Sequence, residues 1–183
     1  MALALYDFGW VVMYDQPETA LAAFEESLEL SKAGATDTAY AHSLCRSAAL
    51  RAQRGDRHAL VQLRDAIAFS HEIRSLITTM AVLDYGTRVL AALGASALGA
   101  SVAGFLESGG RTVPWTVAGP DAGARTKALQ QLKDDLDPEQ FERHYAHGAQ
   151  LDYDSLIQAL LQGLDAIINA DRREFENNDG ART

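Results

Sequence analysis

Apolar residues of similar size recur along the first two thirds of the chain at a step of 39 positions. This step relates Phe24, Leu63 and Val102; Leu5, Leu44 and Leu83; and Leu28, Ile67 and Leu106. Periods of this length are typical of stacked helix pairs, because one pair alone cannot bury its apolar face. The pattern therefore predicts a continuous layer of helix hairpins with an extended groove, a shape that is typical of binding proteins.

Within each repeat, apolar residues at helical spacing mark two amphipathic helices. In residues 17–34, for example, Phe24 and Leu28 fall on one face, whereas Glu25 and Glu29 fall on the other. Gly55 and Gly94 lie one step apart and mark the turns inside the second and third hairpins. The hairpin helices are expected at residues 2–14, 17–34, 38–53, 57–72, 74–92 and 97–107.

The last third of the chain departs from the repeat. Residues 109–121 carry glycine and proline around Val113, Trp115 and Val117, which predicts a long connection packed on the surface. The whole chain is expected to form one helical-repeat domain of residues 1–177. This domain comprises hairpins in 1–108, the loop 109–121 and C-terminal helices in 122–177, and a disordered tail is expected at 178–183.

Capping signals divide the C-terminal region into three helices. The first is expected over residues 122–136. Asp137 followed by Pro138 and Gln140 is a variant of the capping box, so a second helix is expected to begin there, and Gly148 is expected to end it. Asp152 is placed to cap a third helix over residues 153–175.

The two terminal helices are unusually apolar. The helix at 153–175 carries a wide stripe, which either seals the end of the stack or meets another chain. The helix at 2–14 is apolar nearly all round, so an upstream repeat or a second copy is expected to cover it. A self-association surface is therefore expected to contain Val11, Leu156, Leu160, Leu164 and Ile168.

Composition narrows the function classes. The 183 residues include 16 Lys and Arg against 25 Asp and Glu, a formal net charge of −9, so direct nucleic-acid binding is disfavoured. Cys45 is the only cysteine, which excludes an intramolecular disulfide and favours a reducing compartment. The N-terminal segment lacks the features of a signal peptide, and no apolar stretch has the length of a membrane helix. A cytoplasmic protein without membrane contact is expected.

The hairpin pattern resembles the tetratricopeptide class, with Gly9 where two helices cross closely and Ala20 and Phe24 in the second helix. A more specific likeness runs from Ser101 to Leu160. This region resembles the C-terminal tetratricopeptide-like helical-repeat region of actinobacterial signal-transduction NTPase regulators, which are LuxR-type or adenylate-cyclase-linked. The segments that carry the likeness are, in order, 101–107, 125–132, 136–141 and 148–156.

The resemblance implies an all-α, right-handed stack of helix hairpins with extra C-terminal helices. It also implies a non-catalytic protein-interaction or ligand-sensing module of a bacterial transcriptional or signalling regulator. The expected partner is a protein, or the upstream domains of a longer regulator. The chain departs from the family because it contains no G-x-x-x-x-G-K-[ST] loop and no helix-turn-helix after the last helix. It is therefore expected to be a fragment or a stand-alone relative of the sensor part, and a homodimerising structural domain is the alternative function.

In tetratricopeptide superhelices the first helix of each hairpin lines the groove. Carrying that geometry over selects the candidates Tyr6, Trp10, Met13, His42, Cys45, Asp84 and Arg88. Tyr6 and Trp10 lie four residues apart and either form a binding hot spot or pack beneath a missing repeat. Asp84 and Arg88 have the same spacing and either grip a polar ligand or form an ion pair on the helix surface.

Catalytic and metal motifs are weak in this sequence. His144 and His147 share a helix face, as do His42 and Cys45, but a metal site needs three or four converging donors. No serine or cysteine lies in a recognisable nucleophile motif with an identifiable base. The sequence therefore predicts neither an enzyme nor a bound metal or cofactor.

Overall fold

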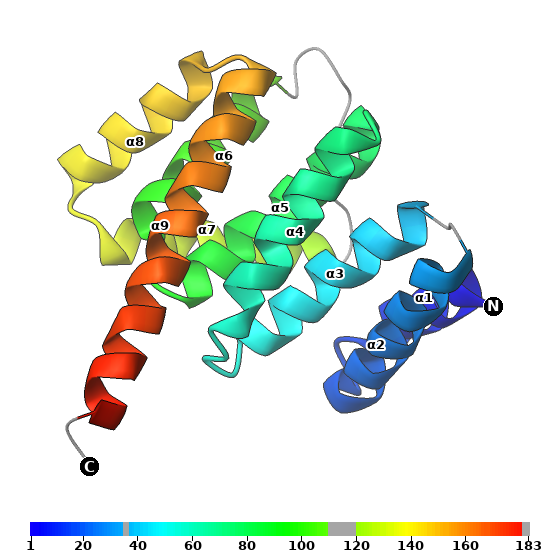
Figure 1. Ribbon diagram of the computed structural model, residues 1–183. Helices are drawn as coiled ribbons and strands as arrows, with labels where there is room; N and C mark the ends of the chain where they lie inside the picture. Colours follow the sequence, from blue (N-terminus) through cyan, green and yellow to red (C-terminus); the bar gives the residue numbers. More distant parts are fainter. Residues whose placement is uncertain (35–36, 110–119, 181–183) are drawn as a thin grey trace.

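The computed structural model describes residues 1–34, 37–109 and 120–180, which form nine α-helices and no strand (Figure 1). No helix in these ranges combines the length and apolar character needed to span a bilayer. The helices are α1 (Ala2–Val12), α2 (Pro17–Gly34), α3 (Asp37–Ala52), α4 (His58–Glu72), α5 (Leu76–Ala92), α6 (Ser96–Gly109), α7 (Pro120–Asp135), α8 (Pro138–Gln150) and α9 (Tyr153–Gly180).

The predicted capping residues begin helices as expected. Asp137 Oδ1 accepts a hydrogen bond from the Gln140 amide at 2.8 Å, and Pro138 is the first residue of α8. Asp152 Oδ1 accepts the amide of Ser155 at 2.8 Å, which begins α9. Both bonds satisfy amides of the first turn that have no partner within the helix.

Two helices extend further than predicted. Helix α8 continues through Gly148 to Gln150, so Gly148 does not end it. Helix α9 continues to Gly180, a few residues into the segment expected to be a disordered tail. Most of the expected loop at 109–121 lies outside the described residues, but Gly109 belongs to α6 and Pro120 begins α7.

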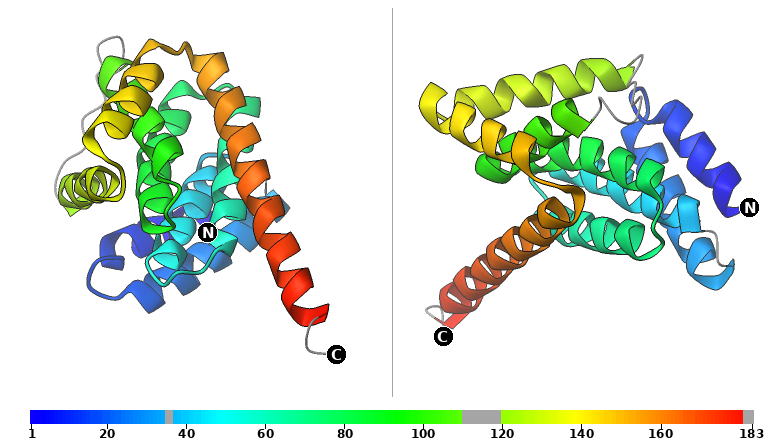
Figure 2. Two further views of the ribbon diagram at one scale, coloured as in Figure 1. Left: turned by 90° about the vertical axis from the view of Figure 1, so that its left-hand side faces the viewer. Right: turned by 90° about the horizontal axis from the view of Figure 1, so that it is seen from above.

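Consecutive helices pack against each other from α1 to α6, and α3 also contacts both α1 and α5. Helices α1, α3 and α5 therefore contact one another in series. The C-terminal helices add to this layer, because α7 packs on α5, α8 packs on α6, and α9 packs mainly on α4. The C-terminal end of α9 extends away from the other helices (Figure 2).

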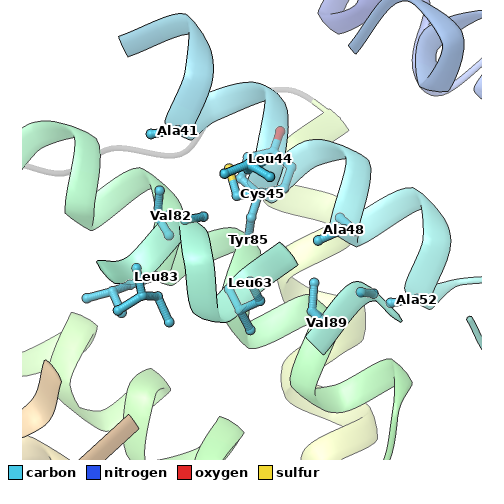
Figure 3. Packing of buried hydrophobic residues seen from close by; sticks show 14 of the residues in the cluster. Ala41, Leu44, Cys45, Ala48, Ala52, Leu63, Val82, Leu83, Tyr85 and Val89 are labelled. Carbon is cyan, nitrogen blue, oxygen red and sulfur yellow. The ribbon is translucent and has the colours of Figure 1, made fainter. Parts of the chain in front are cut away.

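The core forms where the 39-residue pattern places apolar residues. Phe24, Leu63 and Val102, one step apart, are all fully buried. Figure 3 shows Leu63 of α4 close to Leu83 and Val89 of α5 in this core. The pattern identifies most buried positions, because each face of an amphipathic helix is set by local spacing. Leu5, which belongs to the same pattern, is only partly buried.

The apolar stripe of α9 lies against the same core. Leu156, Leu160 and Leu164 are buried there, and Ile168 is partly buried beside them. Arg64 Nε of α4 also donates a hydrogen bond to Asp165 Oδ1 of α9 at 3.0 Å. This bond holds α9 against α4. In this arrangement the three leucines face the core of their own chain and are not available to a second copy, which corrects their expected place on a self-association surface.

Candidate functional site

Aromatic and charged side chains from α1, α3, α5 and α7 meet beside the α1–α3–α5 series. We call this group the aromatic–arginine cluster. Its members are Tyr6, Trp10, Met13, Tyr14, His42, Arg46, Asp84, Tyr85, Arg88, Asp121 and Arg125.

Arg46 of α3 lies at the aromatic end of the cluster. Its guanidinium carbon is 5.3, 4.8 and 4.6 Å from the ring centres of Tyr6, Trp10 and Tyr85. These distances fit cation–π attraction, which is stronger away from water. Arg46 is only 5% exposed, and no carboxylate among the described residues forms an ion pair with it. Its Nε–H also has no acceptor within the described part of the chain.

Arg88 of α5 lies at the acidic end. Its Nη2 donates to Asp84 Oδ2 at 2.8 Å, and its Nη1 donates to Asp121 Oδ1 at 2.9 Å. Arg88 and Asp84 are 9% and 2% exposed, so the ion pair expected on the helix surface is instead buried. Helix α7 packs on α5 here and contributes Asp121, which the spacing of residues within α5 could not reveal.

Asp121 connects α7 to α5 and to the turn that follows α1. Its Oδ1 accepts hydrogen bonds from the hydroxyl groups of Tyr14 and Tyr85 as well as from Arg88. Burial alone would raise the pKa of Asp121, but these three donors outweigh it and lower the pKa. Burial and the bond to Asp121 raise the pKa of Tyr14 to about 12. The carboxylate is therefore charged at neutral pH and both phenols keep their protons.

The pKa of Asp84 is shifted in the opposite direction to that of Asp121. Burial is the largest effect on this carboxyl and raises its pKa, although Arg88 and Arg125 oppose the shift. Arg125 Nε of α7 is 3.5 Å from Asp84 Oδ1, an ion pair without good hydrogen-bond geometry. Helix α7 thus contributes both a carboxylate and a guanidinium to the buried charges of α5.

His42 and Cys45 lie on α3 next to Arg46. Tyr6 Oη is 3.4 Å from His42 Nδ1, and Cys45 is fully buried. Burial, with help from the Arg46 charge, lowers the pKa of His42 to about 4. Burial raises the pKa of the Cys45 thiol to about 12. Both side chains are therefore neutral at pH 7, and the thiol is neither a metal ligand nor a nucleophile in that state.

A cavity of about 470 Å³ lies next to Arg88, between α3, α5 and α7. Its polar wall comes from side chains on four helices or their turns, and alanines supply most of the apolar wall. The lining residues are Tyr14, Ala49, Gln53, Arg88, Ala92, Gly123, Ala124, Lys127, Ala128 and Gln131. Cavities of this volume are in the range that small molecules occupy in proteins.

The structure brings together most of the candidates for the groove, but it buries many of them. The buried candidates are Tyr6, Met13, Cys45, Asp84 and Arg88. Trp10 remains 47% exposed. The candidates thus form a packed cluster with an accessible edge at Trp10, and whether this edge binds a partner stays a prediction.

Sequence reasoning missed several members of the cluster. Arg46 and Tyr85 are one 39-residue step apart and contact each other in the cluster. The repeat therefore placed them at equivalent positions of neighbouring hairpins, and this was a signal that both belong to the site. Asp121 and Arg125 follow the long connection, and no local pattern relates them to α5.

Two further expectations concern other parts of the chain. Val11, expected on a self-association surface, is 77% exposed on α1. His144 and His147 line a small cavity between α6, α8 and α9 whose other lining residues are mainly apolar. The described ranges contain no group of three His, Cys, Asp or Glu side chains placed to hold a metal.

Comparison of the chain with family models, curated proteins and solved structures finds no match. The resemblance to actinobacterial regulators therefore stays a prediction, and the site must be interpreted from its own chemistry.

Proposed function

We propose that this protein is a non-catalytic protein-interaction or ligand-sensing module of a bacterial transcriptional or signalling regulator. In this proposal, the pairs α1–α2, α3–α4 and α5–α6 are three hairpins of a tetratricopeptide-like, right-handed stack. The 39-residue register of buried residues and the serial contacts of α1, α3 and α5 support it. The partner is a protein or another domain of the regulator.

The observation that carries the proposal is the convergence of three equivalent helices on one cluster. The guanidinium of Arg46 on α3 contacts the rings of Trp10 on α1 and Tyr85 on α5. Tryptophan, tyrosine and arginine are the residues most enriched in interaction hot spots, because they bury much area and also bond to polar groups. The half-exposed ring of Trp10, held against a fixed guanidinium, is a preorganised contact for a partner.

The titration behaviour of the cluster supports a role without catalysis. A nucleophilic thiol needs a lowered pKa, whereas burial raises that of Cys45 to about 12. A general base acts best with a pKa near 7, whereas that of His42 is lowered to about 4.

The experiment compares Trp10→Ala with Phe175→Ala. Both residues are exposed aromatics, but Phe175 lies on α9, away from the cluster. The immobilised protein is used to capture partners from the source cells, mass spectrometry identifies them, and the affinity of the purified partner is then measured. We expect Trp10→Ala to weaken binding by about 2 kcal/mol or more, as hot-spot residues do, and Phe175→Ala to leave it unchanged.

Stability measurements separate a binding role from a packing role. Trp10→Ala should change the free energy of unfolding by much less than the roughly 3 to 5 kcal/mol typical of a core aromatic. A loss of that size, or equal binding by both variants, would contradict the proposed contact.

A second candidate function is self-association through α1. Leu3, Phe8 and Val11 are exposed on this helix, and Val11 is the most exposed of the three. Clustered exposed apolar residues are typical of interfaces. Sedimentation over a range of concentrations tests this function: a dimer that Val11→Glu converts to a monomer supports it, and a monomer at all concentrations excludes it.

A further inference from the structure

We propose that the exposed face of α1 binds an amphipathic helix of a protein partner, and that a lysine or arginine of this helix pairs with Asp7. We call this surface the α1 face, and its residues are Ala4, Asp7, Phe8 and Val11. The inference rests on the proposed function, because it names a class of partner for the same interaction module.

Each residue of the α1 face is exposed, whereas its equivalents one and two 39-residue steps later are buried. Val11 is 77% exposed, but Leu50 of α3 and Val89 of α5 are buried. The other buried equivalents are Ser43 and Val82 for Ala4, Arg46 and Tyr85 for Asp7, and Ser47 and Gly86 for Phe8. Four positions that are covered in α3 and α5 are therefore open in α1.

In α3 and α5 the preceding hairpin covers these positions. Helix α2 packs on α3, where Ser43 Oγ donates a hydrogen bond to Ser27 Oγ of α2 at 3.1 Å. Helix α4 packs on α5, where a Cβ atom on Gly86 would lie 3.1 Å from Leu63 Cδ1 of α4. Helix α1 packs on α2 and α3, which both follow it, so no helix in the described ranges occupies the corresponding place. The repeat thus indicates that the neighbour which fits the α1 face is a helix.

Asp7 determines the charge that this helix must carry. It is exposed at the middle of the eleven residues of α1, and it forms no ion pair within the described part of the chain. The equivalent residues of α3 and α5 reach back to the preceding first helix. Arg46 contacts the rings of Tyr6 and Trp10 on α1, and Tyr85 contacts the guanidinium of Arg46 on α3.

By the same register, Asp7 lies where a helix packed on the α1 face would cover it. Covering a carboxylate with apolar surface is costly unless a counter-charge is supplied. The apolar residues Phe8 and Val11 on either side fit the apolar stripe of an amphipathic helix. The partner helix is therefore apolar on the contacting side, with a lysine or arginine opposite Asp7.

A second copy of this chain fits the α1 face less well. In a symmetric pair both copies use the same patch, so Asp7 at the middle of α1 would meet the Asp7 of the second copy in parallel and in antiparallel pairing. Residues 1–31 contain no lysine, arginine or histidine that could separate the two carboxylates. Like charges brought together in an interface oppose association, so the charge pattern favours a cationic helix from another protein.

The experiment titrates the full chain with three synthetic peptides of about 20 residues, a length at which a helix is populated in water. The peptides share a leucine stripe and a polar face of glutamine. They differ only at the central residue of the stripe, which is lysine, glutamine or glutamate. Fluorescence anisotropy of the labelled peptides gives the dissociation constants, and amide chemical shifts locate the site. We expect the lysine peptide to bind about tenfold or more tightly than the glutamate peptide, with shifts in α1.

Charge reversal at Asp7 tests the proposed pair. Asp7→Lys should invert the preference, so that the glutamate peptide binds more tightly than the lysine peptide. Glu26→Lys is the matched control, because Glu26 is exposed on α2 and its equivalent Asp65 on α4 is exposed as well. It makes the same change of net charge and should leave the preference within about twofold of the wild type.

An uncharged substitution tests the apolar part of the face. Val11→Ser should weaken binding of all three peptides about tenfold or more, because it removes the most exposed apolar contact of α1 without adding a charge. Ile77→Ser is the control, since Ile77 is 68% exposed at the start of α5, away from the α1 face. It should leave all three affinities within about twofold of the wild type.

Four results would overturn the inference. These are no saturable binding of the lysine peptide, equal affinities of the lysine and glutamate peptides, an unchanged preference in Asp7→Lys, or a dimer through α1 that the lysine peptide does not displace. The last result would assign the face to a second copy. The Trp10→Ala experiment tests the proposed function separately, because it uses the captured partner and does not depend on the charge preference of the peptides.

Discussion

Gly148 of α8 lies directly against the backbone of Ser101 on α6, so closely that a Cβ atom on Gly148 would overlap the Ser101 carbonyl oxygen. Gly104 of α6 meets the backbone of Tyr145 on α8 in the same way. The two helices therefore pack backbone against backbone, and each glycine provides the space for the other helix. Gly148 is required for this contact rather than for ending a helix.

Gly148→Ala should strongly destabilise the protein. The obstacle is backbone, which cannot move aside as a flexible side chain does, so we expect a loss of about 3 kcal/mol or more in the free energy of unfolding. Urea unfolding followed by circular dichroism measures it. Gly123→Ala is the control, because a Cβ atom there meets nothing within 4 Å. It lies within α7 and should be neutral or stabilise by up to about 1 kcal/mol. Similar effects of the two changes would contradict the close crossing.

Arg88→Met should cost about 3 to 5 kcal/mol, because it leaves the buried carboxylate of Asp84 without its main partner. Lys32→Met is the control, since Lys32 and Glu29 form an ion pair at 2.9 Å on an exposed face of α2. Exposed pairs contribute little, so this change should stay within about 1 kcal/mol. The same urea experiment compares them, and a loss below 1 kcal/mol for Arg88→Met would show that the pair is not buried in solution.

His42 should make stability fall as the pH decreases from 6.5 towards 4. In the unfolded chain the imidazole takes up a proton near pH 6.5, whereas in the folded chain its pKa is about 4. The unfolded state therefore binds more protons in this window and is favoured, by roughly 1 to 3 kcal/mol at its lower end. Above pH 6.5 the contribution is fully present.

His42→Gln should remove this part of the pH dependence. The difference in unfolding free energy between pH 7 and pH 4.5 should be smaller for the variant than for the wild type. Between pH 7 and pH 8 the two proteins should show the same slope. Parallel stability curves down to pH 4 would mean that the folded imidazole titrates normally.

Arg74→Gly should stabilise the protein by about 0.5 to 1 kcal/mol. Arg74 follows α4 with φ of 52°, in the left-handed region, where a side chain is strained and glycine is not. Gly55 and Gly94 have φ of 73° in the turns inside the second and third hairpins. Gly55→Ala and Gly94→Ala are the reverse test and should each cost about 1 kcal/mol. Thermal unfolding compares the three variants, and a destabilised Arg74→Gly would show that the arginine side chain contributes more than the strain costs.

The local sequence pattern determined where the core residues lie and where several helices begin. The 39-residue step located Phe24, Leu63 and Val102 in the core, and the cap residues Asp137 and Asp152 located two helix starts. These features depend on residues within one or two turns of each other. Helical periodicity decides which face of a helix is apolar, and a side-chain oxygen decides which amide it caps, so both can be predicted from a short stretch of chain.

The tertiary structure decided which helix packs on each exposed helix face. Helix α7 brings Asp121 to Arg88 and buries an ion pair that looked like a surface pair, and α9 turns Leu156 into the core rather than towards a second chain. Gly148 had the spacing of a helix end, but the approach of α6 gives it another role. Such choices depend on the summed packing of surfaces far apart in the sequence. Periodicity shows that a face must be covered, and only the packed fold shows by what.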